Sequence, residues 1–198
     1  MFTTFIILAS ISAVLLILAA AALRVINAEM HLYALAPIAA LGIFAGATIR
    51  NRSNAFIITL AAQFLSDCYF QFFTNTPGFY GISQLFTYGA MALVTLIGMQ
   101  MQTRKALSIL GYTLSGSLVF FILSNFGVWV NDCFANPATR MYSSDLNGLA
   151  QTFLMALPFY TPTGTSLFFN ALVSDMFCSG VLFGAFALLQ KKASAKSI

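Results

Sequence analysis

Long apolar stretches dominate this chain, and they restrict it to folds that a lipid bilayer can hold. Only 7% of the 198 residues are charged, against about 25% in a soluble domain, and 60% are hydrophobic. A helix needs about 20 mostly apolar residues to cross a bilayer. Six stretches reach or approach that length: 2–23, 32–49, 55–73, 82–102, 106–131 and 166–189. We therefore predict an all-α membrane protein with a single domain, residues 1–198, folded as one bundle of six transmembrane helices.

Two segments have a competing interpretation. The stretch 2–23 resembles a signal peptide because the run Ala19–Ala22 looks like a cleavage site, but no basic residue precedes it and it exceeds the usual 7–15 or so apolar residues. We predict a retained helix. The segment 149–160 is too short to span and ends near Pro158, so it is either interfacial or re-entrant.

The basic residues are distributed unevenly among the predicted loops. The loops after the second, fourth and sixth stretches hold Arg50, Arg52, Arg104, Lys105, Lys191, Lys192 and Lys196. The other loops hold only Arg24 and Arg140. Because short cytoplasmic loops are enriched in Lys and Arg, we predict cytoplasmic N- and C-termini and outward-facing loops at 24–36, 74–81 and 132–165. The protein would be multi-pass, in the cytoplasmic (inner) membrane if it is bacterial.

Several function classes are disfavoured. The nine Lys and Arg are too scattered to form a nucleic-acid-binding face. The three cysteines have no metal-ligand spacing and His31 is the only histidine, so we predict neither a metal site nor another cofactor. The chain has no phosphate-binding loop, so any use of ATP requires a partner.

Two aspartates, Asp67 and Asp175, lie deep inside apolar stretches. A charged side chain at the centre of a membrane helix costs about 2.5–3.5 kcal/mol, so each requires a partner, a water-filled cavity or a function. Counting residues from the helix ends places both at a depth similar to that of Asn125, in the outer half of the bundle.

Polar and aromatic side chains recur at helical spacing near these groups. They define a predicted ligand-binding set: Asp67, Gln71, Tyr88, Phe121, Asn125, Trp129, Asn170 and Asp175. The alternative is that they supply interhelical hydrogen bonds worth about 0.6 kcal/mol each. The inner segments 41–49 and 180–189 are almost purely apolar. The pattern therefore favours a pocket that opens outward and is closed inward.

Small residues also recur four apart, which lets helices approach closely. The pairs are Ala9/Ala13, Ala36/Ala40, Gly42/Gly46 and Gly180/Gly184. Most such pairs pack inside their own bundle, but we predict Ala9 and Ala13 as a docking face for another membrane subunit. Arg24 and Glu29 are expected to pair at the surface or to meet lipid headgroups.

Several motifs carry a resemblance to a known family. They are Arg24, His31, 37–46, Ser66-Asp67, 125–129 (Asn-Phe-Gly-Val-Trp), Gly148-Leu149, Pro158-Phe159, 170–175 and 182–184. Together they resemble an uncharacterised bacterial multi-pass membrane family that is similar to the S (substrate-binding) components of energy-coupling-factor (ECF) vitamin transporters. Two departures are Ala34-Leu35, where the family has Asn-Phe, and the additional residues 161–168. If that Asn contacts ligand, a different ligand is expected here.

The resemblance implies that the chain binds a small, vitamin-like molecule and passes it to ECF-type transmembrane and ATPase subunits. An alternative is a stand-alone ion- or proton-coupled secondary transporter that uses Asp67 and Asp175. Uptake that requires a partner ATPase, or that follows an ion gradient, would distinguish the two. A third alternative, an intramembrane aspartic protease, lacks the sequence contexts of those enzymes, so we predict that the protein is not an enzyme.

Overall fold

The computed structural model describes residues 2–30, 38–160 and 171–195, and within these ranges the chain is helical and contains no strand. The helices are α1 (Phe2–Glu29), α2 (Ile38–Thr48), α3 (Arg52–Phe73), α4 (Ile82–Met99), α5 (Ala106–Phe134), α6 (Leu146–Tyr160) and α7 (Ala171–Ala195). In the described part, four of them, α3, α4, α5 and α7, are long and apolar enough to cross a membrane. The prediction of an all-helical chain with membrane-spanning helices is confirmed at this level.

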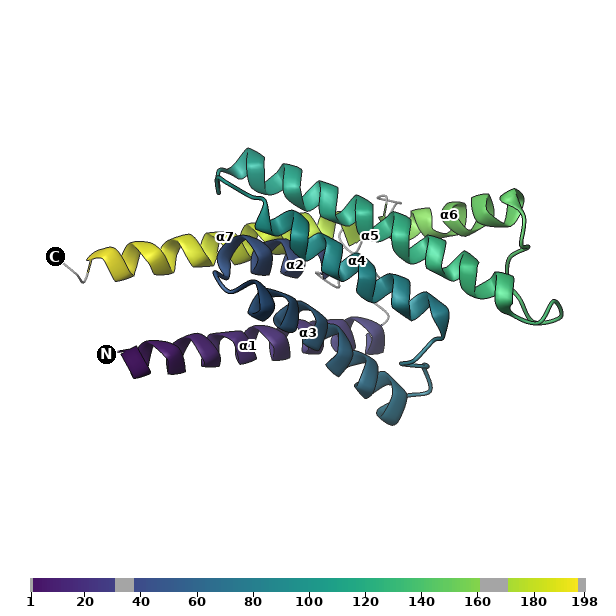
Figure 1. Cartoon of the computed structure of the whole chain (residues 1–198), viewed down its shortest axis with the longest axis horizontal. Helices are drawn as coiled ribbons and strands as arrows, with labels where there is room; N and C mark the ends of the chain where they lie inside the picture. The colour runs from purple at the N-terminus through teal and green to yellow at the C-terminus, as the bar shows by residue number, and fades with distance from the viewer. Residues whose placement is uncertain (1, 31–37, 161–170, 196–198) are drawn as a thin grey trace.

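The two termini lie at the same end of the elongated molecule, on the left in Figure 1. The α2–α3 and α4–α5 connections lie toward this end, which we call the terminal end. The α3–α4 and α5–α6 connections lie at the opposite end, which we call the loop end, together with helix α6 (Figure 1). Helix α4 packs most extensively against α5 and α2, and α1 packs mainly against α3.

Helix α2 forms the centre of the molecule. It is apolar on every side, and Ala40, Ile43 and Ala45 are fully buried, because α2 packs against α3, α4, α5 and α7. The described helix has 11 residues, which is too short to span a membrane, whereas the sequence predicted a spanning stretch at 32–49. It begins directly after Pro37 in the sequence; residues 31–37 lie outside the described ranges.

The crossing of α2 and α4 depends on glycine. A Cβ atom added at Gly98 would lie 2.5 Å from the Ile43 carbonyl oxygen, and one added at Gly46 would lie 2.7 Å from the Met99 nitrogen. The predicted pair Gly42/Gly46 thus packs inside the bundle. A Cβ at Gly180 or Gly184 would meet nothing within 4 Å in the described part of the structure. Ala9 and Ala13 belong to α1, but their side chains lie outside what the structure describes.

Helix α6 corresponds to the short segment predicted at 149–160. Asp145 begins it: its side chain accepts a hydrogen bond from the Gly148 N–H at 2.8 Å, and its carbonyl accepts one from the Leu149 N–H. Hydrogen bonds from the Ser143 hydroxyl and the Gly148 N–H lower the pKa of the Asp145 carboxyl. The apolar part of α6 is too short to cross a membrane, and α6 packs mainly against α5.

Candidate functional site

The Asp67 carboxylate lies at the centre of a buried polar cluster. Asp67 is fully buried on α3, and its Oδ1 forms an ion pair with Arg24 Nη1 of α1 at 2.5 Å. Its Oδ2 accepts hydrogen bonds from the Tyr88 hydroxyl at 2.8 Å and from Gln84 Nε2 at 3.2 Å, both on α4. The predicted surface or headgroup role of Arg24 is therefore wrong. Helix α1 continues past the predicted end at residue 23, and this places the guanidinium beside α3 instead of in a loop.

This cluster also fixes the α3–α4 loop, residues 74–81. Gln71 Oε1 accepts hydrogen bonds from the backbone N–H groups of Gly78 and Phe79, both at 3.2 Å. Gln84 Nε2, already bound to Asp67, donates a second, longer bond to the Gly78 carbonyl. A Cβ atom at Gly78 would lie 2.7 Å from the Gln71 nitrogen, so only glycine permits this approach of the loop to α3. The loop is held in one position, and it carries Tyr80.

Asp175 has a different set of partners. Its Oδ2 accepts a hydrogen bond from the Ser117 hydroxyl of α5 at 2.6 Å, and its Oδ1 accepts one from the Ala40 N–H at 3.1 Å. The Ala40 N–H belongs to the first turn of α2, where helical N–H groups have no partner within the helix. Asp175 is 4% exposed and thus acts as a buried cap for α2, where a negative charge is favoured.

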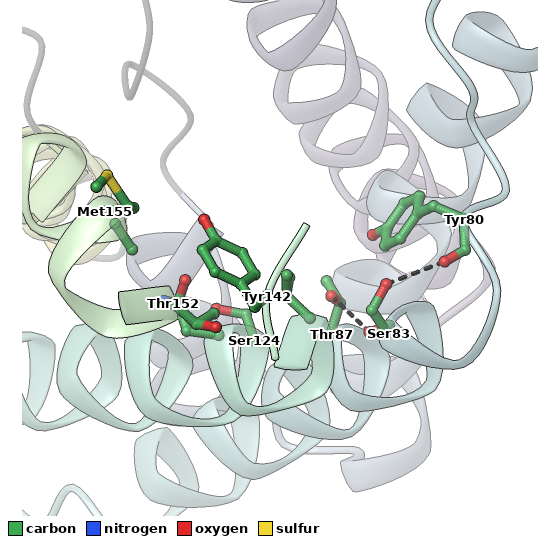
Figure 2. Close-up of a pocket in the computed structure, with 10 residues that line it drawn as sticks. Tyr80, Ser83, Thr87, Ser124, Tyr142, Thr152 and Met155 are labelled. Atoms are coloured by element: carbon green, nitrogen blue, oxygen red, sulfur yellow. Dashed lines mark hydrogen bonds between the residues drawn. The ribbon is translucent and has the colours of Figure 1, made fainter. Parts of the chain in front are cut away.

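A pocket of about 380 Å³ opens between α4, α5 and α6 at the loop end. Its described lining residues come from these helices and from the two adjoining loops: Tyr80, Ser83, Thr87, Ser124, Asn125, Val128, Tyr142, Thr152, Met155 and Ala156 (Figure 2). The volume lies in the range of about 300–1,000 Å³ that is typical of small-molecule sites. None of the described lining side chains carries a charge.

Loop contacts hold the two tyrosines of the pocket in place. The Asp132 carboxylate accepts hydrogen bonds from the Met141 and Tyr142 backbone N–H groups at 3.1 and 2.9 Å. Tyr80 lies between the pocket and the Asp67 cluster, and burial raises the pKa of its phenol above 10.0 by more than hydrogen bonds with Thr87 and Gln63 lower it. Tyr80 is therefore a neutral phenol at physiological pH.

The predicted ligand-binding residues are divided among different positions. Asn125 lines the pocket. Gln71 holds the α3–α4 loop, Tyr88 donates a hydrogen bond to Asp67, and Asp175 caps α2. Asn170 lies outside the described residues.

Two predicted aromatic residues support the pocket walls. The Trp129 indole N–H donates to the Ser143 carbonyl at 3.1 Å, directly beside Tyr142 in the sequence. The Phe121 ring packs edge-on against Phe153 of α6, with 5.6 Å between ring centroids. These contacts join α5 to the α5–α6 loop and to α6, the elements that supply Tyr142 and Thr152.

The sequence analysis missed most of the lining residues, although a similar polar pattern lies one position earlier on α4. On α4 we selected Tyr88, and the face that Tyr88 shares with Gln84 contacts Asp67. The pocket is lined by Ser83 and Thr87, which share the same four-residue spacing one position earlier. One residue rotates the side chain by about 100° around the helix, so the neighbouring stripe faces a different cavity.

Within the described residues, no three His, Cys, Asp or Glu side chains gather in a way that could hold a metal ion.

Comparison with known proteins identifies the family to which the chain belongs. No curated protein and no solved structure matches the chain. The family described as "Family of unknown function (DUF6580)" matches residues 6–196. Since this match covers nearly the whole chain, the protein belongs to the DUF6580 family.

Proposed function

We propose that this protein is an integral membrane substrate-binding protein, similar to an ECF S component, that captures a small vitamin-like molecule. The observation that supports this most strongly is the pocket between α4, α5 and α6, which lies at the end of the molecule opposite both termini. Hydroxyl, amide, aromatic and apolar side chains line it together. A few polar groups in a mainly apolar cleft are typical of small-ligand sites.

The proposal includes a topology in which six segments cross the membrane, α1, α3, α4, α5, α7 and the whole stretch 32–49 to which the short helix α2 belongs, and both termini are cytoplasmic. The exposed basic residues support it: Arg50, Arg52, Arg104, Lys105 and Lys191 follow α2, α4 and the apolar part of α7. These segments lead to the terminal end in Figure 1. The loop end, with its pocket, would then face outward.

Cysteine labelling tests this topology. In a variant without native cysteines, Arg140→Cys should react with a membrane-impermeant maleimide in intact cells, because residue 140 lies in the α5–α6 loop. Lys191→Cys should react only after the membrane is permeabilised. Labelling of the second variant in intact cells would contradict the topology.

Neither buried carboxylate favours the alternative of a stand-alone ion- or proton-coupled transporter. Asp67 is paired with Arg24, and Asp175 is bound to Ser117 and to the N-terminal turn of α2. Since both carboxylates have partners inside the protein, we propose structural roles for them. Transmembrane and ATPase partners are proposed from the sequence resemblance, with Ala9 and Ala13 of α1 as the docking face.

Blocking the pocket tests the proposed function. Native mass spectrometry of the detergent-purified protein should show a bound small molecule. Ala156→Phe should remove it, because Ala156 lines the pocket and a phenyl ring would fill it. Ala185→Phe is a matched control at an exposed position of α7 and should retain the molecule. A protein without any bound molecule, or an Ala156→Phe variant that keeps it, would contradict the proposal.

A further inference from the structure

The polar side chains that line the pocket offer mainly hydrogen-bond acceptors. We propose that it takes an uncharged, planar ring compound that presents N–H donors, such as a carboxamide or amino-substituted heterocycle; this rests on the proposed function. Three features of the lining carry the inference: the direction of its hydrogen bonds, its lack of charge and its two tyrosine rings.

The serine and threonine hydroxyl groups of the lining already donate hydrogen bonds within the protein. Each donates to a backbone carbonyl in the preceding turn: Ser83 to Tyr80 at 3.0 Å, Thr87 to Ser83 at 3.1 Å, Ser124 to Phe120 at 2.7 Å and Thr152 to Gly148 at 2.9 Å. Such bonds are the usual arrangement for Ser and Thr inside helices. A hydroxyl has one proton and two lone pairs, so these four oxygens can only accept further hydrogen bonds, and the Thr87 oxygen is already bonded to Tyr80.

The other polar groups of the lining also leave few hydrogen-bond donors free for a ligand. Asn125 Nδ2 donates to the Phe121 carbonyl at 2.7 Å, which leaves its Oδ1 as a further acceptor. The Tyr80 hydroxyl is engaged with Thr87 and Gln63. The Tyr142 hydroxyl and the second N–H of Asn125 are the remaining donors of the described lining. A ligand rich in acceptors would displace water from these oxygens without replacing its hydrogen bonds, which carries a desolvation cost.

The charge and the aromatic surfaces of the pocket restrict the class of ligand further. None of the described lining side chains is charged, and the nearby Asp67 and Arg24 are already paired with each other behind Tyr80. A charged ligand would therefore lose its hydration without meeting a counter-charge. Tyr80 and Tyr142 both line the pocket (Figure 2), and tyrosine rings offer flat apolar surface that suits an aromatic ring.

A matched panel of compounds tests the inference on the full chain in detergent micelles. The panel consists of benzamide, N,N-dimethylbenzamide, benzoate and benzamidine, with the same four substituents on pyridine and pyrimidine rings. Binding is followed by thermal shift and by fluorescence of Trp129, the single tryptophan, whose N–H is bonded beside Tyr142. The primary carboxamides should bind at least about tenfold more tightly than the dimethylated compounds, which lack donors, and than both charged series.

Two serines on α5 provide a matched pair of variants. Ser124 lines the pocket, whereas Ser115 is exposed and makes the same kind of bond to its own helix, to the Gly111 carbonyl at 2.9 Å. Ser124→Ala should weaken carboxamide binding about five- to tenfold and leave the weak binding of the dimethylated compounds unchanged. Ser115→Ala should change neither. Equal effects of the two substitutions would contradict a specific acceptor role for the Ser124 hydroxyl.

The outcomes separate this inference from the proposed function. Equal or tighter binding of the dimethylated, carboxylate or amidine compounds overturns the inference and leaves a small-molecule site in place. If no panel compound binds, the co-purified molecule decides by mass and fragmentation: an uncharged ring with N–H groups supports the inference, and a carboxylate or phosphate overturns it. Absence of both panel binding and any co-purified molecule contradicts the proposed function itself.

Discussion

Asp67→Asn is expected to lower the free energy of unfolding by about 3 kcal/mol. The substitution keeps the size of the side chain and removes its charge, so Arg24 loses the carboxylate to which it is paired at 2.5 Å. Removing one partner of a buried pair leaves the other charge uncompensated, which costs about 3–5 kcal/mol. We expect the lower end because Arg24 is 20% exposed. Equilibrium unfolding in mixed detergent micelles, followed by circular dichroism, measures the change.

Two controls separate the ion pair from a general loss of packing. Arg24→Gln should cost a similar amount, and the double variant Arg24→Gln/Asp67→Asn should be more stable than the sum of the single changes predicts, because no unpaired charge remains. Asp175→Asn should cost clearly less, since an amide oxygen can still accept from Ser117 or the Ala40 N–H and no cation is left alone. Additive effects of the Arg24 and Asp67 substitutions would contradict the pairing.

Gly46→Ala is expected to destabilise the protein by about 2–3 kcal/mol. Its new methyl group would meet the backbone of α4, with the Met99 nitrogen at 2.7 Å and the Gly98 carbonyl carbon at 2.9 Å. Backbone atoms cannot rotate away as a side chain does, so α2 and α4 would have to separate. The same unfolding measurement tests it.

Gly180→Ala is the matched control for the helix crossing. Gly180 is also a helical glycine, but a Cβ there meets nothing within 4 Å in the described structure. Alanine has the higher helix propensity, so this substitution should stabilise the protein by about 0.5–1 kcal/mol. Opposite signs at the two positions are the expected result; a loss at both would show that the α2–α4 contact is not the cause.

The helices could be predicted from the sequence because hydropathy is a local property. The long apolar stretches at 55–73, 82–102 and 106–131 correspond to α3, α4 and α5 with small changes at their ends. The shortness of α2 was harder to predict from the sequence, because an apolar run does not reveal whether lipid or protein surrounds it. Here α2 is enclosed by four other helices, which makes every one of its faces apolar.

The candidate site was less predictable for a geometric reason. The buried aspartates marked positions that need partners, but helical spacing does not identify those partners, which come from other helices. Arg24 reaches Asp67 only because α1 packs against α3, and the Ala40 N–H reaches Asp175 only because α2 begins inside the bundle. Asn125 lies at the pocket, together with side chains of α4 and α6, and its role in ligand binding stays a prediction. Ser83 and Thr87 were missed because the neighbouring stripe on α4 was equally polar.

The cap that Asp175 provides for α2 has a consequence for how the protein is made. Ribosomes deliver helices to the membrane in chain order, so α2 leaves the translocation machinery long before α7 is synthesised. The acceptor for the Ala40 N–H, and the Thr113–Ser179 bond that joins α5 to α7, become available only when α7 has been synthesised. The central helix is therefore completed well after its own synthesis, and a nascent chain that stops before α7 would contain α2 without its Asp175 cap.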